Sequence, residues 1–428
     1  MIVASDWAGK RYAVLGLARS GAATVSALLE GGASVVAWDS DPAKREAFVA
    51  HGRLSIVPLD DLSGFDALVV SPGVPLNTHP LAAAARAAGV PVIGDIELFA
   101  QARKDLPPHK VVGITGTNGK STTTALVHHI LKTAGVPTLM GGNIGLPILG
   151  QEPLPEGGVY VLELSSYQID LTQSLDCDVA VLLNITPDHL DRYDGFSGYA
   201  ASKARLFAMQ SAGHVAVVGT GDEASAHIAQ GLAGRTDDLV TIAASGIDQS
   251  RWPALQGPHN AQNAQAAIAV ARALGIGEDV IEAGLASYAS LPHRMQHVAT
   301  RNGVAFVNDS KATNPESTAP ALAAFPRVHW IVGGKRKGDD LDACAAHLDH
   351  VVAAYTIGEA APLFFDLLKD KVPVVEQSGT LEAAVAHAAA AAQPGDTVLL
   401  SPACASFDQF RDYEARGEAF RVAVEALA

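Results

Sequence analysis

Short apolar runs alternate with alanine-rich segments along the first hundred residues of the chain. The runs YAVLGLA, SVVAWD, ALVVSPG and VPVIGD are typical of buried strands, whereas AATVSALLEGG and HPLAAAARAAG have the composition of helices. Strands that alternate with helices predict βα units and a parallel sheet. We therefore expect one α/β domain over residues 1–100.

The same alternation returns twice after a break at residues 105–109, where DLPPH predicts a linker. The second run begins at KVVGITGTNGKSTTTALVHHILKTAG, passes through YVLEL and VAVLLNIT, and ends after the helical segment HNAQNAQAAIAVARALG, near SLPHR. The third contains WIVGG, AAYTIG, VPVVE and TVLLSPA, with a helix predicted over residues 381–392. We expect two further α/β domains, over residues 101–291 and 292–428.

The charge and cysteine content restrict the partners. Thirty Lys+Arg against 45 Asp+Glu give a net charge of −15, which repels polyanions and argues against nucleic acid or an anionic membrane as the main partner. No apolar run reaches the length of a membrane span. Cys177, Cys344 and Cys404 are too few and too scattered for a disulfide framework. We therefore expect a cytoplasmic protein.

The strongest chemical signal is VVGITGTNGKSTTTALV, an apolar strand followed by a glycine-rich turn and a helix. Such a turn directs backbone N–H groups at phosphates, while Lys120 reaches the outer phosphates and a hydroxyl of Ser121 or Thr122 can ligate Mg²⁺. Ile114 stands where the common G-x-x-x-x-G-K-[ST] pattern has its first glycine. The strand–turn–helix context compensates for this departure, so the segment predicts a variant phosphate loop.

A nucleotide phosphate needs a divalent cation, so its ligands should lie at neighbouring strand ends. Glu163 interrupts the apolar strand YVLEL, where an unpaired carboxylate would be costly. His189, in the loop of LLNITPDHLDRY, is either a second ligand, a proton carrier or a surface histidine. Asp188 and Asp191 are either part of this site or a helix cap and a partner for Arg192.

A weaker motif lies near the N-terminus, in AVLGLARSG. Its glycines, Gly16 and Gly21, suit a dinucleotide-type turn, although Ala18 replaces the second glycine of G-x-G-x-x-G. Asp39 closes the next predicted strand, from which a carboxylate can meet a ribose hydroxyl. We favour a nucleotide site here over a plain βαβ turn.

These strings make the chain resemble a known family. GITGTNGKST, LELSSYQ and NITPDHLDRY, followed in order by GPHNAQNAQAA, LPHR, NDSKATN and LLSPACASFDQF, resemble the Mur ligases of peptidoglycan synthesis from Gly16 to about Phe420. Within the family, SPACASFDQF and GVAFVNDSKATN are most similar to the members that add D-glutamate. The resemblance implies a Rossmann-like UDP-binding domain, a central P-loop ATPase domain and a Rossmann-like amino-acid-binding domain, in a monomer.

The resemblance also implies a reaction. ATP phosphorylates the carboxylate of UDP-N-acetylmuramoyl-L-alanine, and the amine of D-glutamate attacks the acyl phosphate. By matching positions, the ATP-binding residues are Gly116, Thr117, Asn118, Gly119, Lys120, Ser121, Thr122, Asn260, Asn263, Arg294 and Asp309, and the catalytic residues are Lys120, His189, Lys203 and Lys311. Two Mg²⁺ ions are implied, with Ser121, Glu163, His189 and Lys203 as ligands, Lys203 through a carbamate. Without the resemblance, the segment ASKARLF predicts that Lys203 is a surface charge.

The substrate residues follow in the same way. The UDP-linked substrate is implied to bind at Ser20, Asp39, Ser40, Gly73 and Asn143, with His189 beside it, and D-glutamate at Thr313, Lys337, Ser406, Phe407 and Tyr413. Either Lys335 or Lys337 of GGKRKG faces the amino acid.

Four alternatives remain from the sequence. Another Mur ligase or a folylpolyglutamate synthase shares the three-domain plan, but the latter has no need of a complete first βα domain. A P-loop switch would not need NDSK, SPACASFD or Lys203. A dehydrogenase rests on AVLGLARSG alone.

Overall fold

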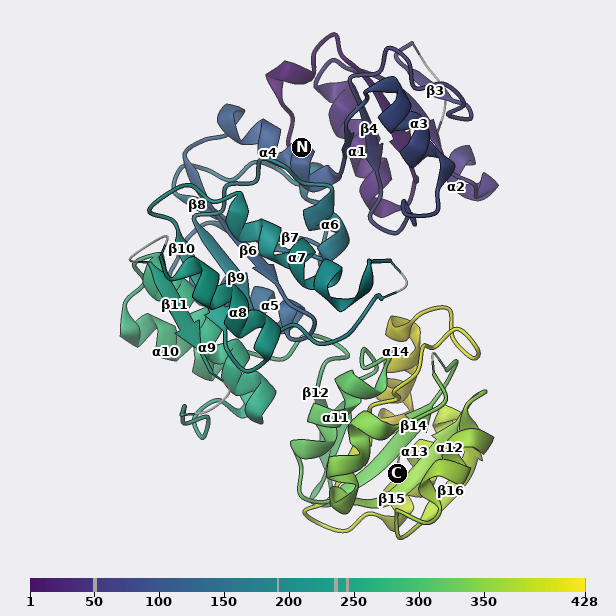
Figure 1. The fold of residues 1–428 in the computed structure, drawn as a ribbon. Coiled ribbons are helices and arrows are strands. Elements are labelled where there is room, and N and C mark those ends of the chain that lie inside the picture. Colours follow the sequence, from purple (N-terminus) through teal and green to yellow (C-terminus); the bar gives the residue numbers. More distant parts are fainter. Residues whose placement is uncertain (49–51, 191, 235–237, 244–245, 337, 428) are drawn as a thin grey trace. The chain divides into compact units, whose positions relative to one another are not determined.

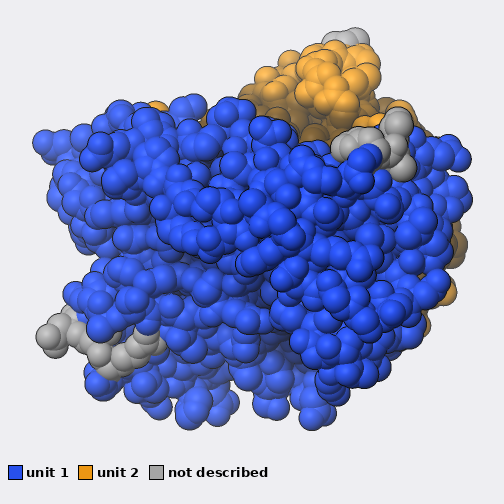
Figure 2. Space-filling model, turned by 90° about the horizontal axis from the view of Figure 1, so that it is seen from above, with its two compact units in different colours: residues 1–243, 262–284 blue, residues 244–261, 285–428 orange. Residues whose placement is uncertain are grey.

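A computed structural model describes residues 1–48, 52–190, 192–234, 238–243, 246–336 and 338–427 (Figure 1). Residues 1–243 with 262–284 form one compact unit, and residues 244–261 with 285–428 form the other (Figure 2). None of the described helices is both long and apolar enough to cross a membrane.

The first sheet is parallel, with strand order β3-β2-β1-β4-β5. Its strands are β1 (Arg11–Leu15), β2 (Ser34–Trp38), β3 (Leu54–Ile56), β4 (Ala67–Val70) and β5 (Val92–Ile93), and its helices are α1 (Arg19–Glu30), α2 (Pro42–Glu46), α3 (Pro80–Ala88) and α4 (Asp95–Ala102). Alternate residues of β1 enter two different apolar clusters. Both faces of the strand are therefore buried, as the continuous apolar runs predict.

The second sheet is also parallel, with order β11-β10-β9-β6-β8-β7. Its strands are β6 (His109–Thr115), β7 (Thr138–Gly142), β8 (Gly158–Glu163), β9 (Val179–Leu182), β10 (Val215–Gly219) and β11 (Leu239–Ile242). Its helices are α5 (Lys120–Thr133), α6 (Ser166–Asp170), α7 (Gly195–Ala208), α8 (Glu223–Leu232), α9 (Pro258–Ala273) and α10 (Glu278–Ser287), the last two of which contain the divisions between the units.

The third sheet has the order β12-β13-β17-β14-β15-β16, with β12 antiparallel to β13 and the other pairs parallel. Its strands are β12 (Gln296–Arg301), β13 (Val304–Asn308), β14 (Val328–Gly333), β15 (Val351–Ile357), β16 (Val375–Gly379) and β17 (Thr397–Leu400). Its helices are α11 (Pro315–Ala323), α12 (Ala361–Leu368), α13 (Leu381–Ala391) and α14 (Tyr413–Glu425).

The predicted α/β class with predominantly parallel sheets is confirmed, whereas some local elements differ. The run VPVVE at 372–376 forms a strand only at its end, because β16 spans Val375–Gly379. Pro373 lacks the N–H that a paired strand residue donates. DLPPH contains the last residue of a 3-10 turn, Asp105, and the first residue of β6, His109. Only residues 106–108 form the connection.

Candidate active site

The phosphate loop joins β6 to α5. It leaves the sheet at the carboxyl end of β6 and ends at Lys120, the first residue of the helix. Gly119 has a φ of 84°, and a Cβ there would lie 2.3 Å from the side-chain oxygen of Asn263, so glycine is required. The Lys120 ammonium donates to the carbonyl oxygens of Gly116 and Thr117, at 2.8 and 2.7 Å. A cation and a helix N-terminus thus meet at one loop, which suits an anion.

Residues that follow the neighbouring strand β9 hold the phosphate loop through hydrogen bonds. The Asn118 N–H donates to the side-chain oxygen of Asn184 at 2.9 Å, and the Asn184 amide donates back to the Asn118 carbonyl at 3.2 Å. Thr117 and Thr186 exchange two further hydrogen bonds, of 3.2 and 3.0 Å. These contacts arise because β6 and β9 are adjacent parallel strands whose carboxyl ends lie at the same edge. Thr122 is half-buried in the first turn of α5.

Three predicted residues meet at a buried carboxylate. Glu163, at the carboxyl end of β8, is 2% exposed. One of its oxygens accepts from the Ser121 hydroxyl at 2.5 Å, and the other accepts from the Asn143 amide at 2.8 Å. Such a carboxylate is costly when only neutral groups contact it. Because Mg²⁺ prefers oxygen ligands, Glu163 and Ser121 fit a hard divalent cation, which would screen the phosphate charge.

His189 lies in the loop after β9 with a φ of 54°, a conformation that is uncommon outside functional loops. Its Nε2 is 3.5 Å from a carboxylate oxygen of Asp188, and its ring centroid is 5.0 Å from that of Tyr167. Asp191 lies outside the described residues. Within the described part of the chain, no group of three His, Cys, Asp or Glu side chains is arranged to hold a metal. A joint role of His189 and Glu163 stays a prediction.

Lys203 is buried in α7, with 1% of its surface exposed. Its ammonium donates to the Gly116 carbonyl at 2.9 Å and lies 4.6 Å from the centre of the Tyr199 ring. Burial, and then the charge of Lys120, lower the pKa of Lys203 well below its ordinary value. The interpretation of Lys203 as a surface charge is therefore wrong.

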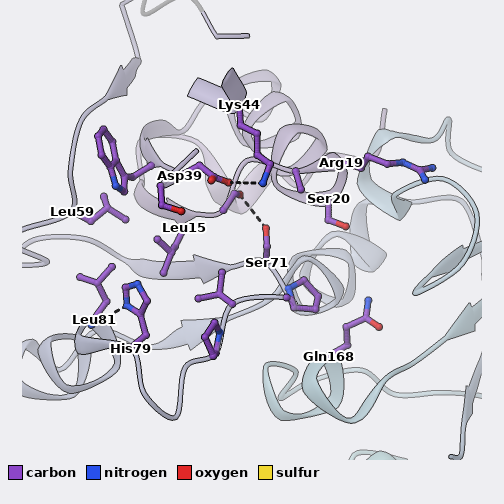
Figure 3. Close-up of a pocket in the computed structure, with 18 of the residues that line it drawn as sticks. Leu15, Arg19, Ser20, Asp39, Lys44, Leu59, Ser71, His79, Leu81 and Gln168 are labelled. Carbon is purple, nitrogen blue, oxygen red and sulfur yellow. Dashed lines mark hydrogen bonds and ion pairs between the residues drawn. The ribbon is translucent and has the colours of Figure 1, made fainter. Parts of the chain in front are cut away.

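A pocket of about 1000 Å³ opens at the carboxyl end of the first sheet. Figure 3 shows Ser20, Asp39 and Ser71 among its lining residues, and the Ser71 hydroxyl donates to the Gly16 carbonyl at 3.0 Å. Gln168 also lines the pocket, and it comes from α6, a helix of the second sheet in the same unit. The pocket includes all five residues predicted for the UDP-linked substrate: Ser20, Asp39, Ser40, Gly73 and Asn143.

Asp39 is held in its charged form at this pocket. Its two oxygens accept from the N–H groups of Leu17 and Asp41, at 2.7 and 2.9 Å, and Lys44 lies 3.8 Å away. Burial pushes the pKa of Asp39 upward, but the two backbone hydrogen bonds and Lys44 outweigh it, so that the pKa lies below its ordinary value. An ionised acceptor at the end of β2 suits N–H or hydroxyl donors of a nucleoside.

In the second unit, Asp309 and Lys311 follow the carboxyl end of β13. The Asp309 carboxylate accepts from the Ser401 hydroxyl at 2.8 Å and from the Met295 N–H at 3.2 Å. Burial raises the pKa of Asp309 to about 7. The Lys311 ammonium lies 4.1 Å from the centre of the Tyr413 ring. Residues predicted for phosphate chemistry and for the acceptor are therefore in contact.

The remaining acceptor residues are in contrasting environments. Ser406 is 2% exposed, whereas Phe407 next to it is 68% exposed. Thr313 is half-buried, as is Arg294, which is predicted to bind ATP. Lys337 lies outside the described residues.

The two asparagines predicted for adenine are on α9. Asn260 is 5% exposed and donates to the Gln256 carbonyl at 3.1 Å. Asn263 is 2% exposed and accepts from the Thr123 hydroxyl at 3.1 Å. Both side chains therefore contact other parts of the protein.

Sequence reasoning missed three residues of these sites. Asn184 was detectable as the one polar residue that ends the apolar run VAVLLN. Gln168 was detectable as the third helical residue of a capping box that begins at Ser165. Arg416, which is buried beneath the loops of the third sheet, has no local signal in DYEARGEAF.

Comparison with protein families and curated proteins gives a consistent result. A MurD-like N-terminal domain of Mur ligases matches residues 10–94, the Mur ligase middle domain matches 114–253, and the glutamate ligase domain of Mur ligases matches 293–404. A protein of Novosphingobium aromaticivorans named UDP-N-acetylmuramoylalanine–D-glutamate ligase is 66% identical, with 100% of this chain and 97% of that one covered. The chain belongs to the Mur ligase family. A Sphingopyxis alaskensis protein of the same name is 64% identical to this Mur ligase, with both chains fully covered.

Solved Mur ligases share the fold of this one. UDP-N-acetylmuramate-alanine ligase MurC of Thermotoga maritima is 17% identical with a TM-score of 0.59, over 97% of this chain and 99% of that one. MurF ligase of the same organism, in complex with ADP, is 18% identical with a TM-score of 0.61, over 99% and 97%. A dehydrogenase or a nucleotide switch does not fit this membership, and the MurD-like first domain disfavours a folylpolyglutamate synthase.

Proposed function

We propose that this Mur ligase joins D-glutamate to UDP-N-acetylmuramoyl-L-alanine in the synthesis of peptidoglycan precursors. The observation that carries the proposal is the 66% identity, over the whole chain, to a relative named for this reaction. The substrate carboxylate attacks the γ-phosphorus of ATP, forming an acyl phosphate and releasing ADP. The amine of D-glutamate then attacks the acyl carbon, loses a proton and expels phosphate, which leaves an amide.

ATP binds at the phosphate loop in this proposal. Lys120 exchanges the Gly116 and Thr117 carbonyls for the outer phosphates, where its charge stabilises phosphoryl transfer. The Gly119 N–H and the first turn of α5 meet the same anion, and Thr117 and Asn118, whose N–H groups donate to Asn184, hold the loop around it. Asn260 and Asn263 bind the adenine.

Two Mg²⁺ ions belong to the proposal. Ser121 and Glu163 hold the first, and their hydrogen bond in the free protein supports this pairing of oxygen donors. Lys203 bears a carbamate that holds the second, with His189 beside it. The lowered pKa supports this role, since only a neutral amine reacts with CO₂, and the reaction releases one proton. The ions supply charge neutralisation at the phosphates.

The UDP-linked substrate binds in the pocket of the first unit. Asp39 and Ser40 contact the nucleoside, Ser20 and Gly73 contact the pyrophosphate, and Asn143 directs the muramoyl arm toward Glu163. The Asn143–Glu163 hydrogen bond supports this path, because it places the pocket wall beside the proposed metal ligand.

Residues of the second unit bind the acceptor amino acid in this proposal. Lys311, Arg294 and Asp309 act on the phosphate groups, and the Lys311–Tyr413 contact supports a site shared with the amino acid. Lys337 and Thr313 bind one carboxylate of D-glutamate, and Ser406 with the Phe407 N–H binds the other. We propose that the enzyme acts in the cytoplasm as a monomer on these small molecules.

Mass spectrometry of the product tests the proposal. UDP-N-acetylmuramoyl-L-alanine, ATP and Mg²⁺ are incubated with the enzyme and an equimolar mixture of D-glutamate, L-lysine and D-alanine. We expect one product, heavier by one glutamyl residue, that depends on ATP. A lysyl or alanyl product, or no product, would overturn the proposal, and sedimentation of the same sample as a stable dimer would overturn the monomer.

A further inference from the structure

The first turn of α14 contains a buried cation, Arg416, with 1% of its surface exposed. A helix N-terminus disfavours positive charge, because its free N–H groups already give that end of the helix a partial positive charge. Among the described residues, no carboxylate lies within ion-pair distance of this guanidinium. Burial lowers the pKa of Arg416 to about 10, so it stays charged at neutral pH. This buried positive charge therefore needs hydrogen-bond acceptors from outside its own helix.

Two loops provide the hydrogen-bond acceptors of the Arg416 guanidinium. Arg416 donates from Nε to the Ser310 hydroxyl at 3.0 Å and from Nη2 to the Ser310 carbonyl at 2.8 Å. Its Nη2 also donates to the Cys404 carbonyl at 3.0 Å, and its Nη1 to the Ala405 carbonyl at 3.2 Å. Ser310 belongs to the β13 loop (residues 309–311), and the other two acceptors belong to the β17 loop (residues 403–406).

Both loops carry residues of the proposed reaction. Ser310 lies between Asp309 and Lys311, and Ala405 directly precedes Ser406. The loops leave adjacent parallel strands, β13 and β17, so they emerge at one edge of the sheet. Ala403 in the β17 loop has a φ of 54°, which is strained for a residue with a side chain. The loop therefore needs contacts that hold this conformation.

We propose that Arg416 is a positioning residue that fixes the β17 loop against the β13 loop and thereby sets the site for the acceptor amino acid. This proposal rests on the proposed function. The planar guanidinium matches carbonyls in several directions at once, which an ammonium at one point cannot do. Without it, three buried carbonyls lose their charged donor, and each unpaired group is costly.

A purely structural role is the alternative, and Arg301 provides the matched control. Arg301 also donates to two backbone carbonyls of the same C-terminal segment, those of Glu425 and Leu427. These lie at the opposite end of α14 from Arg416. Arg301, the last residue of β12, contacts neither loop, so Arg301→Met removes an arginine that binds carbonyls at the other end of α14.

The test compares full-length Arg416→Lys, Arg416→Met and Arg301→Met. Thermal unfolding is measured for each, together with kcat and the KM values for ATP, UDP-N-acetylmuramoyl-L-alanine and the acceptor that the wild type uses. We expect Arg416→Lys to fold and to lose about 100-fold in kcat/KM for the acceptor, with at least about 10-fold in KM, since about 3 kcal/mol of charged hydrogen bonding is lost. Its KM for the UDP-linked substrate, whose pocket contains neither loop, should stay within about twofold. Arg301→Met should keep the acceptor KM.

Other results overturn the proposal. Wild-type acceptor kinetics in Arg416→Lys would do so, as would equal losses for all three substrates, or the same acceptor defect in Arg301→Met. Should Arg416→Met fail to fold, Arg416→Lys decides alone. Failure of the proposed function is distinguishable, because it would appear as a wild-type enzyme that does not use D-glutamate.

Discussion

Buried ionisable groups dominate the chemistry at the scale of single residues. Burial lowers the pKa of Lys203 and raises the pKa of Asp95, so it favours the neutral form of each group. For Lys203 the neutral amine is the reactive form, whereas for Asp95 the neutral acid is the form that burial favours. Both groups therefore give pH-dependent or chemical signatures that can be measured without knowledge of the substrate.

Replacement of Lys203 by Ala should remove the proposed carbamate. We expect most of the activity to be lost and partly restored by a short carboxylic acid in the buffer, which occupies the vacated position. In ¹³C NMR with labelled CO₂, the wild type should show a carbamate resonance that Lys203→Ala lacks. Full activity in Lys203→Ala, or an identical spectrum for both proteins, would contradict this role.

Asp95 should make the stability of the free protein fall with rising pH. It is 4% exposed, one of its oxygens has no hydrogen-bond partner, and burial raises its pKa from 3.8 to about 6. The raised value means that the folded state binds the proton more tightly, so this stability is present below pH 4 and is lost as pH rises to 6. Two pKa units correspond to roughly 3 kcal/mol.

Urea denaturation of wild type and Asp95→Asn between pH 4 and pH 8 measures this effect. The variant should gain stability relative to the wild type up to about pH 6 and then keep a constant difference. A difference that does not change over this range would show that Asp95 is ionised in the folded protein at acid pH.

At the scale of elements, the strand–loop–helix unit around Gly119 was predictable because its signal is local. The apolar run, the glycines and Lys120 stand within a dozen residues of one another, and their spacing fixes their roles. Short elements such as α2 and β3 were not predicted, because they carry too few apolar residues for a period to be visible. The antiparallel β12 was missed because its pairing with β13 depends on a two-residue turn, not on its own pattern.

Gly119→Ala should damage this element in two ways. The alanine would keep a φ of 84°, and its Cβ would collide with Asn263, so we expect a loss of about 1–3 kcal/mol in unfolding free energy and a large loss of ATP turnover. Gly135→Ala is the matched control after the other end of α5, since its φ is 72° and no atom lies within 4 Å of the added Cβ. The control should be destabilised by about 1–2 kcal/mol, from its φ alone, and stay active. Equal effects of both changes on activity would contradict the account.

At the scale of the whole molecule, sequence patterns predicted which segments form sheets but not which strand ends meet. Glu163 and Asn143 contact one another because β8 and β7 are neighbours, and Asn184 reaches the phosphate loop because β9 is next to β6. Strand order is a property of the packed chain, so residues such as Arg416 acquire their role only from the fold. The family resemblance supplied the residue roles that the local patterns left open.

The central claim is the use of D-glutamate as the acceptor, and the release of ADP tests it most directly. With UDP-N-acetylmuramoyl-L-alanine and ATP present, D-glutamate, L-glutamate and D-glutamine are compared as acceptors. A site built for two carboxylates leaves donors unpaired with D-glutamine, and L-glutamate misdirects the amine, so each should be slower by a factor of about 100 or more. Rapid ADP release with D-glutamate alone is the predicted result; comparable rates for all three, or a preference for another amino acid, would contradict the account.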